Sequence, residues 1–212
     1  MLKARTGKAR FDIKSFNKDI MRSSRALHKS YVYPIVLEAF TAEKERFLKE
    51  YEENPITQQM YAGADNPGIN YPGGPLKGIG NLFAFLGFSD GTDPAEDLRN
   101  LLDNYIRLQR NYRVKKSPRG IIYTHIAQAP SKDEIFAATP MSWTSRSWIK
   151  AIENGVGGYQ LYLRGYRTVS RSSGGFLSKN APVRSGSFKN TSYFTKMYNK
   201  FITRLTRGNI RG

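Results

Sequence analysis

Residues 105–127 have the sequence YIRLQRNYRVKKSPRGIIYTHIA. Apolar and polar residues alternate from Tyr105 onward, and this period of two indicates a strand with one buried and one solvated face. Only Arg110 interrupts the apolar face. The next residues, Lys116–Gly120, favour a turn because they contain proline and glycine, and residues 121–127 are again typical of a strand. The stretch therefore predicts an antiparallel hairpin with one basic and one apolar face.

Capping residues predict three helices around this hairpin. Asp93–Glu96 and Ser131–Glu134 carry the capping-box pattern, in which the first side chain and the glutamate three positions later satisfy free backbone N–H groups. Ser145 or Ser147 should cap a third helix. Gly155 is predicted to end that helix, because glycine tolerates the backbone conformation that often follows a helix.

The helical spacing of apolar residues predicts two longer helices. The first occupies residues 15–53, and Pro34 should break or kink it, so that its main segment begins at Ile35. The second runs from Thr191 to Arg207. Its apolar face is so wide that a sheet or another subunit should cover it.

Together these patterns predict an α+β fold, in which a small, mostly antiparallel sheet is covered by a long N-terminal helix and a C-terminal amphipathic helix. Residues 159–163 should supply a third strand. Residues 1–14 are predicted to form a basic N-terminal extension, and residues 15–212 a single domain with long extended loops at 54–80 and 165–190. No run of about 18–20 apolar residues is present, so no membrane partner is expected.

Positive charge is concentrated in the second half of the chain. Residues 1–103 hold 14 Lys and Arg and 14 Asp and Glu, whereas residues 104–212 hold 20 Lys and Arg against three acids. The formal net charge of +17 therefore comes entirely from the second half. This asymmetry indicates nucleic acid, an anionic surface or an acidic protein as the partner, with a merely solvated basic face as the alternative. The candidate contact residues crowd the hairpin: Arg107, Arg110, Arg113, Lys115, Lys116 and Arg119.

Little in the sequence indicates catalysis. The chain has two histidines, His28 and His125, and no cysteine. Neither histidine has another ligand at a metal-binding spacing, so both are predicted to be packed or surface residues, and no metal or cofactor is expected. Gly78–Gly80 lacks the Gly-Lys-Ser/Thr ending of a phosphate loop, and no nucleophile elbow is present. We predict that the protein is not an enzyme.

From Phe40 onward, a series of short segments resembles a family of virion structural proteins from large, contractile-tailed phages. The resemblance does not extend to residues 1–30. The segments that carry it follow one another in a specific order: Glu53–Thr57, Gly80–Phe83, Phe85–Phe88, Gly91–Pro94, Pro130–Pro140, Trp143, Trp148, Gly155, Gly158, Arg171–Gly174 and Gly186–Tyr193.

Residues 181–186, Ala-Pro-Val-Arg-Ser-Gly, are similar to the Ala-Pro-Val-x-Thr-Gly signature of neck or tail-completion proteins, which join the phage head to the tail. Ser185 stands in the place of the usual threonine. The resemblance implies a long N-terminal helix on a small antiparallel sheet, in agreement with the fold predicted above. It also implies a structural subunit of a ring between the portal side and the tail tube, at the neck, tail-completion or tail-terminator position.

The resemblance further implies a homo-oligomeric ring, six- or twelve-fold, in a virion assembled in the host cytoplasm. Its partners would be the neighbouring head–tail connector and tail proteins, with passing genomic DNA as a further candidate. The alternative function is a basic nucleic-acid-binding protein that uses the hairpin of residues 105–126. Subunit contacts are expected at eight residues: Asn54, Pro55, Phe83, Phe88, Arg171, Arg184, Phe188 and Tyr193.

Overall fold

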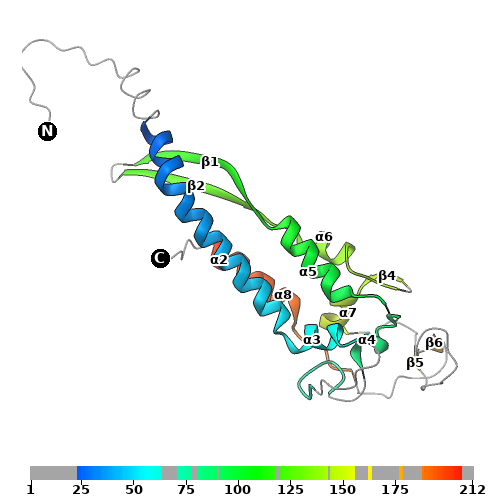
Figure 1. Cartoon of the computed structure of the whole chain (residues 1–212). Helices are drawn as coiled ribbons and strands as arrows, with labels where there is room; N and C mark the ends of the chain where they lie inside the picture. The colour runs from blue at the N-terminus through cyan, green and yellow to red at the C-terminus, as the bar shows by residue number, and fades with distance from the viewer. Residues whose placement is uncertain are drawn as a thin grey trace, which may run out of the picture.

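The computed structural model describes residues 23–63, 71–77, 81–89, 91–117, 120–142, 144–155, 162–163, 177–178 and 188–206. It has the predicted α+β fold, with antiparallel strands, a long N-terminal helix and a C-terminal helix (Figure 1). The helical elements are η1 (His28–Val32), α2 (Tyr33–Glu52), α3 (Pro55–Tyr61), α4 (Leu82–Phe85), α5 (Pro94–Tyr105), α6 (Lys132–Ala137), α7 (Trp148–Asn154) and α8 (Phe194–Thr206). The strands are β1 (Arg107–Ser117), β2 (Gly120–Gln128), β3 (Pro140–Met141), β4 (Thr144–Ser147), β5 (Tyr162–Leu163) and β6 (Leu177–Ser178).

The predicted hairpin is formed by β1 and β2. Their antiparallel register begins with the Arg107–Gln128 pair and is irregular between Leu108 and Tyr112. Among the described residues this hairpin pairs with no other strand, because β3–β4 and β5–β6 form two separate antiparallel pairs. The third strand predicted at 159–163 therefore does not extend the hairpin: β5 pairs with β6, and residues 159–161 lie outside the described part of the chain.

The break predicted at Pro34 is absent. Residues 23–27 are helical, η1 is a π-helical turn, and α2 follows without interruption, since Val32 and Tyr33 both have right-handed helical backbone angles. In the π turn the Tyr33 N–H donates to the His28 carbonyl. Proline has no N–H and its ring displaces the preceding turn of the helix. The wider π turn that comes just before Pro34 lets the chain accommodate this proline without ending the helix.

The long loop predicted at 54–80 is partly helical. Asn54 caps α3, because its Oδ1 accepts the Ile56 N–H at 2.9 Å, and Pro55 occupies the first helical position. Ile56 and Met60 are buried in the core. The Asn-Pro pair is a regular sign of a helix start, but the glycines and prolines further along the segment obscured it. The predicted loop thus contributes a short helix to the core.

The apolar face of α8 packs against α2 of the same chain, and the two helices lie side by side in Figure 1. The Phe47 ring stacks on Phe201 with centroids 4.6 Å apart and meets the edges of Phe194 and Tyr198. All four side chains are buried. The expectation that this face needs a sheet or a second subunit is therefore wrong, because α2 already covers it.

The start of α8 is held by an acidic side chain from α7. The Glu153 carboxylate accepts the Thr195 N–H at 2.6 Å and the Thr195 hydroxyl at 2.5 Å, and the Tyr193 N–H approaches it at 3.4 Å. The N–H groups in the first turn of a helix have no acceptor within the helix, and Glu153 supplies one for α8. Ser147 is the residue that caps α7, by accepting the Lys150 N–H. Glu153 therefore joins α7 to α8, and α8 begins at Phe194 rather than at the predicted Thr191.

The helix starts predicted at Asp93 and Ser131 are confirmed, but of the two predicted capping boxes only that of Ser131 and Glu134 forms. Asp93 Oδ1 accepts the Glu96 N–H at 2.9 Å, and α5 continues to Tyr105, which the sequence pattern had placed in the strand. Ser131 and Glu134 form both hydrogen bonds of a capping box. These caps set the start of the helix before the hairpin and of the helix after it, and thereby fix where the hairpin leaves the core.

Candidate interaction surface on the arm

The hairpin and the beginning of the long helix form one end of the molecule. In Figure 1, β1 and β2 run from the end of α5 to the N-terminal part of the long helix, away from α3, α4 and α7. We refer to the helical residues 23–37 together with β1 and β2 as the arm. Of the predicted contact residues, five lie on the arm, and Arg119 lies outside the described residues.

The strand register brings three predicted contact residues to one face of the hairpin. Arg107 pairs with Gln128, Arg113 with Thr124 and Lys115 with Ile122. The three β2 partners are separated by even numbers of residues, so they and their cross-strand neighbours share a face. All three bases are exposed. Lys116 pairs with Ile121 in the strand register.

Four bases of the arm form no ion pair within the described residues. In the part of the chain that the structure describes, no carboxylate forms an ion pair with Arg107, Arg110, Arg113 or Lys115. Arg204, by contrast, contacts Glu43 at 2.8 Å and Glu50 at 2.9 Å between α8 and α2. Within the described residues, the positive charge of the arm is thus not neutralised, whereas the charge of Arg204 between α2 and α8 is.

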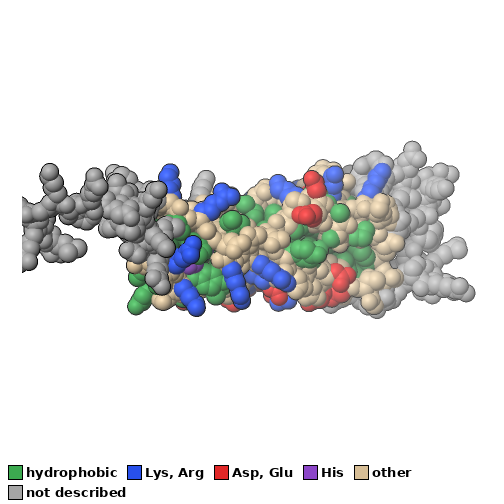
Figure 2. All heavy atoms as spheres, turned by 90° about the horizontal axis from the view of Figure 1, so that it is seen from above, with side chains coloured by type: hydrophobic (Ala, Val, Ile, Leu, Met, Phe, Trp, Pro, Cys, Tyr) green, Lys and Arg blue, Asp and Glu red, His purple; other side chains and the backbone are tan. Residues whose placement is uncertain are grey.

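The arm also exposes large apolar side chains, which Figure 2 shows beside the lysines and arginines of this end. Exposed apolar groups that cluster mark interaction surfaces more often than scattered ones do. Seven such residues of the described chain belong to the arm: Leu27, Tyr31, Ile35, Leu37, Ile121, Ile122 and Ile126. The arm is therefore both basic and partly apolar on its surface.

The inner face of the hairpin is fastened to the helix by aromatic rings. The His28 ring stacks on Tyr112 with centroids 3.5 Å apart, and its Nε2 lies 3.2 Å from Nε2 of His125. The Tyr123 hydroxyl donates to the Ser24 carbonyl at 2.9 Å. His28 is only 4% exposed. We call this cluster the joint. No sequence pattern indicates the joint, because the two histidines are 97 residues apart.

The two Nε2 atoms lie within hydrogen-bonding distance. A hydrogen bond between them requires at least one neutral imidazole, because a protonated imidazole has no acceptor nitrogen. Burial lowers the pKa of His28, and burial followed by repulsion from His28 lowers the pKa of His125. The aromatic neighbours Tyr33, Tyr112 and Tyr123 provide no compensating negative charge. Within the described residues, no three His, Cys, Asp or Glu side chains gather where they could share a metal ion.

We expect the joint to weaken under acidic conditions. In the folded chain the pKa values of His28 and His125 both lie below the ordinary value of 6.5. The state in which the hairpin has separated from the helix therefore binds more protons. The stabilisation that the joint provides above pH 6.5 is consequently lost as the pH falls below this value. Hydrogen exchange of β1 and β2, corrected for intrinsic rates, should be several-fold faster at pH 5 than at pH 7.5. His28→Phe keeps a ring against Tyr112 but cannot titrate, and should reduce this difference. Equal protection of wild-type hairpin at both pH values would contradict the expectation.

The predicted subunit-interface residues are distributed over different parts of the molecule. Phe83 and Tyr193 are 1% exposed and Phe88 is 7% exposed, so these three belong to the core and are not accessible to a second subunit in this conformation. Asn54 and Pro55 begin α3. The remaining three are Phe188, which is half-buried and stacks on Phe85 at 5.4 Å, and Arg171 and Arg184, which lie outside the described residues.

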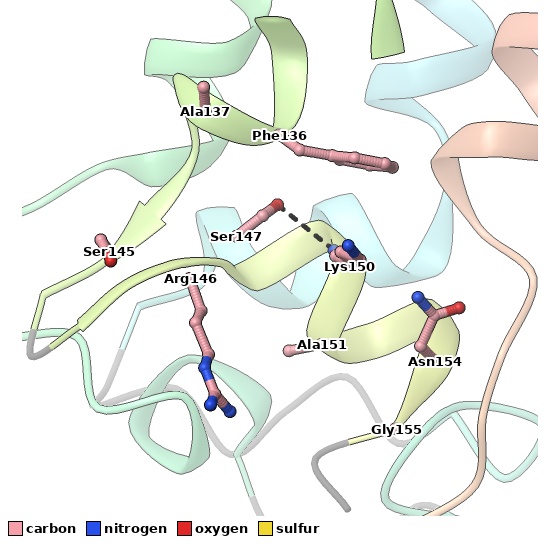
Figure 3. A pocket seen from close by; sticks show the side chains of 9 residues that line it. All are labelled: Phe136, Ala137, Ser145, Arg146, Ser147, Lys150, Ala151, Asn154 and Gly155. Atoms are coloured by element: carbon pink, nitrogen blue, oxygen red, sulfur yellow. Dashed lines mark hydrogen bonds between the residues drawn. The ribbon is translucent and has the colours of Figure 1, made fainter. Parts of the chain in front are cut away.

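A hollow lies away from the arm, between α6, β4 and α7 (Figure 3), with a volume of about 490 Å³. Its lining contains no histidine, aspartate, glutamate or cysteine. The Ser147 hydroxyl caps α7 and is hydrogen-bonded to Thr139 at 2.8 Å, and Lys150 lies 6.0 Å from the centre of the Phe136 ring. Ser147 therefore has a structural role, and the arm remains the better candidate site.

Comparisons of the chain with protein-family models, with curated proteins and with solved structures found no match in any of the three. Among the helices in the described ranges, none is both long and apolar enough to cross a membrane. Inferences about function therefore depend on the geometry of the arm and on the sequence resemblance.

Proposed function

We propose that this protein is a structural subunit of a phage virion that forms a ring at the head–tail junction, in the manner of neck, tail-completion or tail-terminator proteins. The observation that carries the proposal is the arm: its bases have no acidic partner in the described chain, and it exposes large apolar side chains. The core at the other end is closed around buried aromatic residues. The choice of a ring at the head–tail junction rests on the sequence resemblance to neck and tail-completion proteins.

The position of the arm suits contacts between subunits or between neighbouring rings. A surface that meets a different surface on the next copy produces a ring when the rotation closes. Since α8 is covered by α2 and three predicted interface residues are buried, the contacts must use other surfaces. The arm is the part of the described chain where unpaired charge and exposed apolar residues coincide, so it replaces the buried residues as the proposed interface.

Removal of charge from the arm should weaken assembly without unfolding the chain. Arg107→Ala combined with Arg113→Ala changes two exposed residues and should lower the stability by less than about 0.5 kcal/mol. The mass of the complex, measured by light scattering after size exclusion, should fall relative to wild type. Lys132→Ala with Lys196→Ala is a matched control, because it removes two exposed bases outside the arm that form no ion pair within the described residues.

The same measurement at low and high salt, with and without duplex DNA, tests the proposal itself. A closed ring that ignores DNA would support the head–tail function. Loss of the folded state in the arm variant would contradict the assignment of these residues to the surface. A monomer that neither assembles nor binds DNA at any salt concentration would argue against both functions for the isolated chain.

One observation favours a second function, nucleic-acid binding. The major groove of duplex DNA admits a two-stranded ribbon. The hairpin is such a ribbon, and the side chains of Arg107, Arg113 and Lys115 share its outer face. Affinity that depends on phosphate contacts falls steeply with salt, because bound counterions are released. A monomer with strongly salt-dependent DNA affinity would favour this function over the ring.

A further inference from the structure

Arg110 is the residue that interrupts the apolar face of the hairpin, and in the tertiary structure it lines a hollow. It lies between Leu108 and Tyr112, where the register of β1 against β2 shifts. An irregularity of this kind redirects the side chains of the strand that contains it. Arg110 and Asn111 consequently line a hollow beside the joint, together with Tyr112 and Val114.

The fifth residue of this hollow is Arg25, which comes from the N-terminal helix. The hollow has a volume of about 400 Å³. Since four of its residues belong to β1 and one belongs to the helix, it exists only when the hairpin is fastened to the helix. Tyr112, which lines the hollow, is also the ring on which His28 stacks. The hollow and the joint are therefore parts of one structure.

Two arginines line this hollow, Arg25 and Arg110. In the described ranges, neither Arg25 nor Arg110 forms an ion pair with a carboxylate. Like charges at one site repel each other, and an anion between them removes the repulsion. The guanidinium fork matches the geometry of a phosphate group, to which it can donate two parallel hydrogen bonds. Asn111 and Tyr112 also line the hollow, and their side chains carry groups that can donate hydrogen bonds.

We propose that this hollow is a binding site for a phosphate group, held between Arg25 and Arg110. The phosphate could belong to the backbone of a nucleic acid or to a small phosphate compound, and the chemistry of recognition is the same. A ligand that binds only when the hairpin is fastened must also stabilise the fastened state. The site goes beyond the proposed ring, since it requires only the folded arm.

The test titrates the full chain with inorganic phosphate. Binding is detected by NMR of the histidine ring protons or by calorimetry. Arg25→Gln and Arg110→Gln should each weaken phosphate binding about tenfold, the loss expected for one hydrogen bond to a charged group. The double variant should add little, because both arginines hold the same anion. Arg113→Gln removes the same charge from the outer face of the hairpin and should change phosphate binding less than about twofold.

A short DNA duplex, measured by fluorescence anisotropy at fixed salt, identifies the source of the phosphate. Duplex affinity that falls in the Arg25 and Arg110 variants would assign the site to a nucleic-acid backbone, whereas phosphate binding with no effect of these variants on the duplex would assign it to a small phosphate compound. The proposal is overturned if phosphate does not bind, or if Arg113→Gln weakens binding as much as the other two variants. Hydrogen exchange of β1 and β2 must match wild type, which shows that the variants are folded. None of these results depends on ring formation.

Discussion

Phe47→Ala should be among the most damaging substitutions in this protein, with an expected loss of about 3–5 kcal/mol in the free energy of unfolding. Phe47 is fully buried in the centre of α2. Its ring stacks on Phe201 and contacts Phe194 and Tyr198, so it meets α8 at three positions. Alanine would leave a cavity that two helices cannot close without shifting.

Urea denaturation followed by far-UV circular dichroism would measure this loss. Typical domains have only about 5–15 kcal/mol of total stability, so a large shift of the midpoint is expected. Leu37→Ala is the control: it lies on the same helix but is 40% exposed, and it should cost less than about 1 kcal/mol. If both substitutions had similar effects, the packing of α8 on α2 described above would not be the main contact of these helices.

The second large effect is expected from Gly155→Ala, at about 2–4 kcal/mol. Gly155 follows α7 with φ of 86° and ψ of 155°, a conformation that is available almost only to glycine. A Cβ atom at this position would also overlap Oδ1 of Asn190. Asn190 cannot move away without cost, because its Nδ2 donates to the Asn154 carbonyl at 3.1 Å.

Two variants separate the backbone strain from the overlap. Gly91 has a similar φ of 80° but nothing within 4 Å of the Cβ position, so Gly91→Ala should cost only about 1–2 kcal/mol. The loss caused by Gly155→Ala should be smaller in an Asn190→Ala background, because the overlapping atom is gone. Equal losses for both glycines would show that the contact with Asn190 contributes nothing.

The loss at Gly155 should extend to the helix that follows. Glu153, two residues earlier, accepts the Thr195 N–H and hydroxyl at the start of α8. A displaced end of α7 would move this carboxylate away from Thr195. Hydrogen exchange at the first turn of α8 should therefore rise in Gly155→Ala more than in Gly91→Ala.

The parts of the fold that sequence patterns predicted correctly are those set by nearby residues. Alternation along β1, the proline and glycine of the turn and the β-rich composition of β2 predict the hairpin, and Asp93 and Ser131 predict the starts of α5 and α6. Each of these signals acts within a few residues, through pleating or through one hydrogen bond to a free N–H. Asn54-Pro55 carried the same kind of signal for α3, but it was outweighed by the glycines and prolines that follow it.

The candidate surface was predicted only in part. Arg107, Arg113 and Lys115 share a face because strand residues two apart point the same way, which the sequence pattern contains. Arg25, by contrast, had no special sign in the sequence, and it comes beside Arg110 only because the helix and the hairpin meet at the joint. Sequence patterns likewise placed Phe83 and Tyr193 at an interface, because an apolar side chain has the same signature in a core and in a contact between subunits.

The sequence by itself thus determined the hairpin, the helix caps, the glycine after α7 and the concentration of positive charge, since local backbone preferences and composition decide these features. Only the tertiary structure decided that α2 covers α8, that the helix continues through Pro34 and that His28 meets His125. These contacts join residues far apart in the chain, and they depend on which faces pack together once the core closes. The positive charge of the arm thus follows from the sequence, whereas the joint between His28 and His125 follows from the tertiary structure.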